Sequence, residues 1–140
     1  MVKGACNCGA VSFELTGKAS EVTDVYICHC SICRKSTGSG GIAVMVIATP
    51  DFSWLTGQTA IKSWRKPGHD WHTHFCQTCG SPLPGADSEK AMYVPVGLLD
   101  EQDRLKVAHH IWVDSKAGWE LIGDNGKQHP QAFGTAPSQS

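Results

Sequence analysis

The chain has 140 residues, of which 41% are hydrophobic and 18% charged, and its 12 Lys and Arg residues nearly balance 13 Asp and Glu residues. A chain of this length forms one domain around one core, and its near-neutral charge argues against a protein that binds nucleic acid by neutralising phosphates. The longest apolar run, residues 42–48, is far shorter than the roughly 20 residues that a membrane-spanning helix needs. Since residues 1–6 also lack the apolar stretch of a signal peptide, we expect a cytoplasmic protein that does not bind membranes.

Short runs of alternating apolar and polar residues, separated by 15 Gly and 7 Pro, predict a mostly β fold with little helix. In chain order, the expected strands are residues 11–15, 25–28, 41–48, 52–57, 60–64, 71–75, 91–97 and 107–113. The strands 52–57 and 60–64 are expected to flank a turn at Gly57. Ser31 is expected to cap a short helix that ends near Gly38. Residues 1–123 would form a single domain, and the polar residues 124–140 would form a loosely held C-terminal tail with Phe133 as an anchor.

Seven cysteines are the unusual feature of the composition. They fall into three clusters: Cys6 and Cys8, then Cys28, Cys30 and Cys33, then Cys76 and Cys79. An odd number cannot pair fully, the cytoplasm is reducing, and cysteines one or two residues apart rarely bridge each other. Metal binding is the better interpretation, because sites rich in thiolates select zinc or iron–sulfur clusters.

The first and third clusters resemble two knuckles of one closed metal site. Each ends in Cys-Gly, and glycine after the last ligand allows the left-handed turn that wraps a knuckle around a metal. Together they supply four thiolates, the complete tetrahedral shell of a structural zinc. A site that joins such distant parts of the chain would contribute an apparent ~10–16 kcal/mol of metal-binding free energy to folding.

The middle cluster supplies three thiolates and has no fourth cysteine, and an open fourth position is typical of catalytic zinc. Three thiolates donate charge to the metal, which favours activation of a substrate thiol over hydrolysis. Two alternatives remain: a histidine such as His29 closes the site and makes it structural, or the cluster holds iron and sulfur. His29 lies between two ligands, and neighbouring strand residues point to opposite faces, so we expect its ring to face away from the metal.

Four segments resemble motifs of the glutathione-dependent formaldehyde-activating (GFA) family, in the order in which that family has them. They are residues 6–11 (CNCGAV), 28–34 (CHCSICR), 75–83 (FCQTCGSPL) and 110–116 (HIWVDSK), the last followed by Trp119. The resemblance implies a mostly β, Mss4-like twisted-sheet fold with short helices. It also implies two Zn²⁺ per chain, one structural and one catalytic. The structural zinc would be held by Cys6, Cys8, Cys76 and Cys79, and the catalytic zinc by Cys28, Cys30 and Cys33.

The activity implied by this resemblance is that of a carbon–sulfur lyase. Formaldehyde and glutathione would condense to S-hydroxymethylglutathione, with zinc activating the thiol. The partners would be glutathione or a similar small thiol and an aldehyde. Two alternatives stay open: a lyase for another thiol adduct, and a non-catalytic two-zinc module of the same fold that binds a protein.

Four further residues are candidates for substrate binding. Arg34 and Lys35 directly follow the third cysteine of the middle cluster and would attract the carboxylates of a substrate, or else form a solvated helix face. His110 and Trp112 lie in the last family-like motif. His110 would act as an acid or base or make a structural hydrogen bond, and Trp112 would line a pocket or belong to the core.

Overall fold

The computed structural model describes residues 1–136, and its secondary structure is mostly β, which confirms the predicted fold class. The chain divides into two compact units, each made of two separate segments. Unit 1 comprises Met1–Val22 and Met45–Arg104, and unit 2 comprises Thr23–Val44 and the described residues from Leu105 onward. No helix within residues 1–136 is long and apolar enough to cross a membrane.

Unit 1 contains an antiparallel sheet in the order β1-β2-β5. Its strands are β1 (Val2–Ala5), β2 (Ser12–Leu15) and β5 (Phe52–Thr56). Phe13 of β2 is fully buried, and its ring stacks on Phe52 with a centroid distance of 5.4 Å. Unit 1 also holds a hairpin of β6 (Ile61–Arg65) and β7 (His72–Cys76), and an antiparallel pair of β8 (Gly85–Ala86) and β9 (Ala91–Pro95).

The two strands expected around Gly57 do not pair with each other. β5 pairs with β2, whereas β6 pairs with β7. Gly57 has a φ of +78°, and a Cβ atom there would clash with the carbonyl oxygen of Ala10. Because only glycine combines this backbone conformation with so close an approach, Gly57 turns the chain past the first knuckle rather than closing a hairpin.

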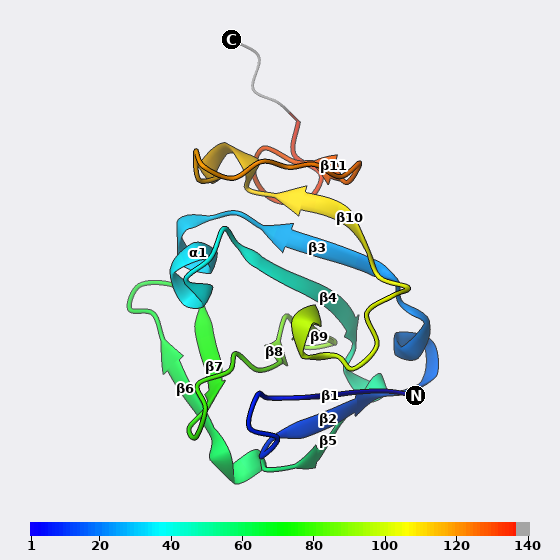
Figure 1. The fold of residues 1–140 in the computed structure, drawn as a ribbon. Helices are drawn as coiled ribbons and strands as arrows, with labels where there is room; N and C mark the ends of the chain where they lie inside the picture. Colours follow the sequence, from blue (N-terminus) through cyan, green and yellow to red (C-terminus); the bar gives the residue numbers. More distant parts are fainter. Residues whose placement is uncertain (137–140) are drawn as a thin grey trace. The chain divides into compact units, whose positions relative to one another are not determined.

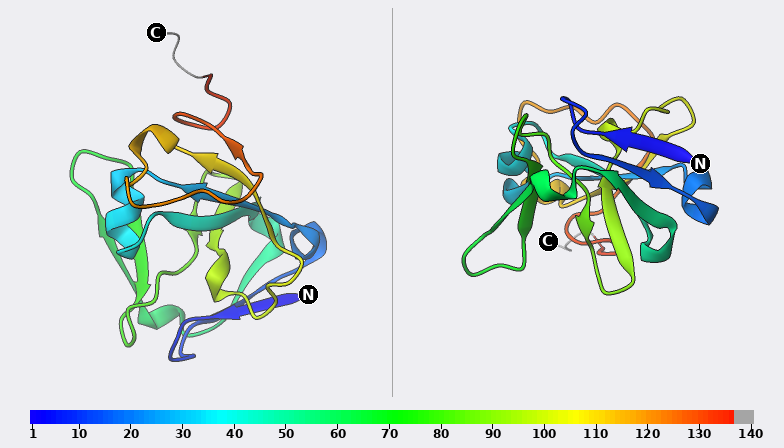
Figure 2. Two further views of the ribbon diagram at one scale, coloured as in Figure 1. Left: turned by 45° about the horizontal axis from the view of Figure 1, so that its top comes forward. Right: turned by 90° about the horizontal axis from the view of Figure 1, so that it is seen from below.

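Unit 2 is built on β3 (Asp24–Cys28), which pairs with two strands. β10 (Lys106–Ile111) runs parallel to it, and β4 (Ile42–Ala48) pairs with it antiparallel through residues 42–44. In Figures 1 and 2 the yellow β10 lies beside the blue β3. Helix α1 (Ser31–Thr37) follows β3 and ends at Gly38, in the left-handed conformation, as the sequence predicts. Five short 3₁₀ turns complete the described elements: η1 (Gly17–Glu21), η2 (Thr49–Asp51), η3 (Gln58–Ala60), η4 (Val96–Leu98) and η5 (Val113–Ser115).

The start of the expected C-terminal tail makes regular contacts with β10. Strand β11 (Lys127–Gln128) pairs parallel with β10, and His129 is 1% exposed. The Phe133 ring lies 4.9 Å from the His129 ring and 5.9 Å from the Tyr26 ring, centroid to centroid. The rest of the expected tail, residues 137–140, lies outside the described residues.

Candidate metal centres and the histidine chain

The first and third cysteine clusters meet in unit 1. The sulfur atoms of Cys6, Cys8, Cys76 and Cys79 all lie within 4.8 Å of one another. The Sγ atoms of Cys6 and Cys8 are 3.6 Å apart, and those of Cys8 and Cys76 are 3.8 Å apart. A zinc ion with Zn–S bonds of about 2.3 Å in a tetrahedron would separate its sulfur ligands by about 3.8 Å. The four-cysteine cluster therefore matches the shell of a tetrahedral zinc.

Both knuckles have the backbone that the Cys-Gly pattern predicts. Gly9 (φ +80°) donates a hydrogen bond from its N–H to the carbonyl of Cys6 at 3.0 Å. Gly80 (φ +77°) donates in the same way to the carbonyl of Cys76 at 2.8 Å. A backbone hydrogen bond therefore closes the turn of each knuckle without a metal ion.

Ser81 joins the two knuckles, and sequence reasoning gave it no role. Its hydroxyl accepts a hydrogen bond from the N–H of Asn7 at 2.9 Å and lies 3.2 Å from the sulfur of Cys79. Hydrogen bonds from the Ser81 side chain and backbone lower the pKa of the Cys79 thiol to about 5. Ser81 therefore favours the thiolate form of Cys79, which is the form that zinc binds. The signal available in the sequence was a hydroxyl two residues after a ligand, which is too common to be specific.

The middle cluster lies in unit 2, between β3 and α1. Cys28 ends β3, Cys30 is the N-cap of α1, and Cys33 lies within the first turns of the helix. The prediction that Ser31 caps the helix is wrong: the sulfur of Cys30 accepts the hydrogen bond from the Cys33 N–H at 3.3 Å. Because a capping side chain must lie beside the first free N–H groups, the cap turns Cys30 toward Cys33.

The three sulfurs of the middle cluster lie within 4.8 Å of one another, and no fourth Cys, His, Asp or Glu in residues 1–136 joins the group. Cys28 and Cys33 are 9% and 6% exposed, and Cys30 is half-buried. A hydrogen bond from the Cys33 thiol lowers the pKa of Cys28 to about 6, and the same bond raises the pKa of Cys33 above its usual value. Ionisation of Cys28 thus opposes ionisation of Cys33, and a divalent metal at the cluster would offset this repulsion.

His29 does not close this site. It is fully buried, and both ring nitrogens are engaged on the side away from the cysteines. Nδ1 lies 3.1 Å from Oε2 of Glu120, and Nε2 lies 2.8 Å from Nδ1 of His110. The expectation that its ring faces away from the ligands is confirmed.

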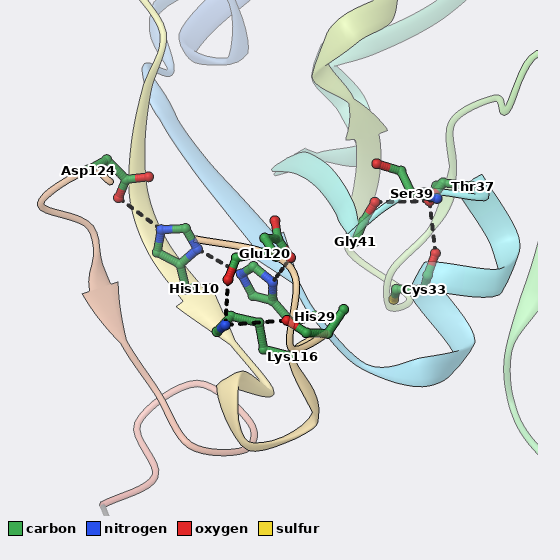
Figure 3. A network of polar contacts seen from close by, with 10 residues as sticks. His29, Cys33, Thr37, Ser39, Gly41, His110, Lys116, Glu120 and Asp124 are labelled. Carbon is green, nitrogen blue, oxygen red and sulfur yellow. Dashed lines mark hydrogen bonds and ion pairs between the residues drawn. The ribbon is translucent and has the colours of Figure 1, made fainter. Parts of the chain in front are cut away.

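His110 extends this contact into a row of four hydrogen-bonded side chains, Glu120–His29–His110–Asp124, which we call the histidine chain. Figure 3 shows these four side chains. Nε2 of His110 donates to Oδ1 of Asp124 at 2.8 Å, and this bond lowers the pKa of the Asp124 carboxyl. Both ring nitrogens of each histidine are thus engaged, and a carboxylate lies at each end of this chain of contacts.

The four expected substrate-binding residues are all in unit 2. Arg34 is half-buried on α1, and its Nε atom is buried without a hydrogen-bond partner. Lys35 is exposed. His110 is 2% exposed with both ring nitrogens bonded, and Trp112 is half-buried at a left-handed backbone position (φ 56°). The structure thus brings His110 to the histidine chain and leaves Arg34 with an unused donor.

Comparison with known proteins places the chain in a family, and the matched residues include both cysteine clusters. The family model for glutathione-dependent formaldehyde-activating enzymes matches residues 1–115. The chain belongs to this family. A Halomonas elongata protein, named as a candidate glutathione-dependent formaldehyde-activating enzyme, is 28% identical over 150 residues, covering 100% of this chain and 91% of the relative. Among solved structures, the crystal structure of a Rhodobacter sphaeroides protein is similar to this chain, with a TM-score of 0.56 and 25% identity over 75% of this chain and 96% of that one.

Proposed function

We propose that the protein is a zinc-dependent carbon–sulfur lyase that forms S-hydroxymethylglutathione from formaldehyde and glutathione. One observation carries the proposal: three cysteine sulfurs converge without a fourth protein ligand among the described residues. Cys28, Cys30 and Cys33 would hold the catalytic zinc and leave a position for the substrate. Cys6, Cys8, Cys76 and Cys79 would hold a structural zinc, because their sulfurs already fill a tetrahedral shell.

The reaction joins a thiol to a carbonyl. Zinc bound by the three cysteines would lower the pKa of the glutathione thiol and hold its sulfur. The sulfur then bonds to the carbonyl carbon, the carbon–oxygen π bond breaks, and the oxygen takes up the proton that the thiol released. The chain contributes position: Cys30 is fixed by its hydrogen bond at the start of α1, and Cys28 by the pairing of β3 with β10 and β4.

Arg34 supports a substrate that carries carboxylates. Its buried, unpartnered Nε–H would find an acceptor in a bound anion, and an unmade buried hydrogen bond otherwise costs about 1–3 kcal/mol. Lys35 is the next residue of the same helix and is exposed, so it would act on the substrate only through its charge. Glutathione has two carboxylates, which fits this pair of cations.

The test is formaldehyde–glutathione exchange followed by two-dimensional exchange NMR, with zinc-loaded protein, its Cys30→Ser variant and buffer alone. Serine is a strong N-cap residue, so the variant keeps α1 while losing one thiolate. We expect exchange well above the buffer rate with the native protein and the buffer rate with the variant.

A fully zinc-loaded native protein that leaves exchange at the buffer rate would overturn the proposal. Other thiol and aldehyde pairs would then be tested for acceleration. If none responded, the non-catalytic zinc module would be the better description.

A further inference from the structure

His29 has a fully buried side chain and lies in the sequence directly between Cys28 and Cys30. A contact that fixes His29 therefore restricts the backbone of both cysteines. The N–H of His29 donates to the carbonyl of Ile111 on β10 at 3.0 Å, and its ring is bonded at both nitrogens. With the backbone and the ring both fixed, the peptide groups that lead to Cys28 and Cys30 have little freedom to turn. The backbone between Cys28 and Cys30 is therefore held in part by the contacts of His29.

Both ends of the histidine chain are themselves held in place. At one end, the Glu120 carboxylate lies against Gly40, where a Cβ atom would clash with it, and the Glu120 carbonyl accepts a hydrogen bond from Nζ of Lys116 at 2.6 Å. At the other end, Oδ1 of Asp124 also accepts from the N–H of Gly126 at 2.8 Å. Each carboxylate is thus held by a second contact besides its histidine, although the Asp124 side chain is 39% exposed.

We propose that Glu120, His110 and Asp124 are positioning residues that hold the Cys28–Cys30 segment, through His29, in the geometry that binds the metal. This inference rests on the proposed function, since it needs a metal at the three-cysteine cluster. Groups that orient metal ligands from outside typically change metal affinity about 10- to 100-fold when they are removed. Here the orienting groups do not touch Cys28 or Cys30 themselves, but act through His29, which lies between them in the sequence.

The test is Co²⁺ titration of metal-free protein, because Co²⁺ bound to thiolates absorbs visible light and its spectrum reports ligand geometry. The variants are Glu120→Ala and Asp124→Ala, which remove the contacts to the histidine rings, and Asp114→Ala is the control that removes an exposed carboxylate in the same unit. Spectra of Cys30→Ser identify the signal of the four-cysteine cluster, which lies in unit 1 and serves as an internal reference. We expect the affinity of the three-cysteine site to fall about 10- to 100-fold in both variants, and that of the four-cysteine site to stay unchanged.

Two results would overturn the positioning role. Either the variants bind Co²⁺ at both sites as tightly as the native protein, or both sites weaken together, which would show a general loss of stability. Failure of the proposed function gives a different pattern: the native protein binds a single Co²⁺ per chain, or it binds two and still leaves formaldehyde–glutathione exchange at the buffer rate. If the native protein binds only one Co²⁺, the positioning role is rejected together with the proposed function. If it binds two, the Co²⁺ affinities of the variants decide the positioning role alone.

Discussion

The two cysteine clusters differ in how far the chain must travel to assemble them. In the four-cysteine cluster, Cys8 and Cys76 are in contact although 68 residues separate them in the sequence. The three-cysteine cluster is contained within residues 28–33. Loss of a metal from the first would open a long loop, whereas the second keeps its cysteines close in any conformation. A metal at the four-cysteine cluster would therefore contribute to folding, whereas the three-cysteine cluster would depend on folding for its geometry.

The surroundings of the clusters agree with this difference. The four-cysteine cluster is supported from within, by two glycine turns and the hydroxyl of Ser81. The three-cysteine cluster is supported from outside, by His29, β10 and two carboxylates that come later in the chain.

The largest expected effect comes from removing a central ligand of the four-cysteine cluster. Cys76→Ser should cost about 5 kcal/mol or more of unfolding free energy, because a structural zinc contributes an apparent ~10–16 kcal/mol. The measurement is urea unfolding of zinc-saturated protein. Cys30→Ser is the matched control and should cost about 1 kcal/mol or less, because the unfolded chain keeps those ligands adjacent and binds metal too. Equal losses of unfolding free energy in the two variants would show that the two clusters do not differ in their contribution to folding.

A second, smaller effect concerns the backbone beside the first knuckle. Gly57→Ala should destabilise the protein by about 3 kcal/mol or more, because the new methyl group meets the Ala10 carbonyl as well as a left-handed backbone. Gly68 has the same φ of +78° with open space around it, so Gly68→Ala should cost only about 1 kcal/mol. Thermal unfolding of both variants checks this difference, and similar costs would show that the close approach does not matter.

A third prediction concerns the effect of pH on His129, whose N–H donates to the carbonyl of His110 on β10. Burial, followed by the nearby His109 and Lys127, lowers the pKa of His129, whose Nδ1 accepts a hydrogen bond from the Gly134 N–H. A group with a lowered pKa stabilises the fold above its unfolded pKa of about 6.5, and this contribution is lost as the pH falls through the folded pKa. His129→Leu should therefore be less stable than native protein at pH 7.5, and the gap should narrow at pH 5.5.

Urea midpoints of zinc-loaded protein at the two pH values give this gap. His69→Leu, at an exposed site, provides the control and should show the same small difference at both. A gap for His129→Leu that is independent of pH would contradict the prediction.

The smallest expected effect concerns the substrate. Arg34→Ala should raise the glutathione concentration needed for half-maximal exchange about tenfold, as loss of a charge-assisted hydrogen bond does. Lys35→Ala should change it by about twofold or less, because exposed charges contribute little. Equal small effects would indicate that both side chains form only a solvated helix face.

Sequence reasoning located the features that depend on local spacing. Cys-Gly pairs and cysteine counts predict the same two groups of cysteines that the structure brings together, and most strands lie within a few residues of their expected positions. Contacts between residues far apart in the sequence could not be predicted in this way. Nothing near His29 in the sequence indicates its contacts with Glu120, 91 residues later, or with His110, 81 residues later. The pairing of β5 with β2 rather than with β6 was missed for the same reason. The domain boundary at residue 123 stays a prediction. So do the metal-binding roles of the seven cysteines and the substrate-binding roles of Arg34, Lys35, His110 and Trp112.

The spacing of the four-cysteine cluster also affects how the protein is made. At about 5–20 residues per second, a ribosome needs about 2–10 s to add residues 34–79 after the three-cysteine segment is complete. During this interval Cys6 and Cys8 have been synthesised but Cys76 and Cys79 have not, while residues 28–33 already contain every cysteine of their cluster. Zinc can therefore reach the three-cysteine segment first, and closure of the four-cysteine cluster becomes a late step in the folding of the nascent chain.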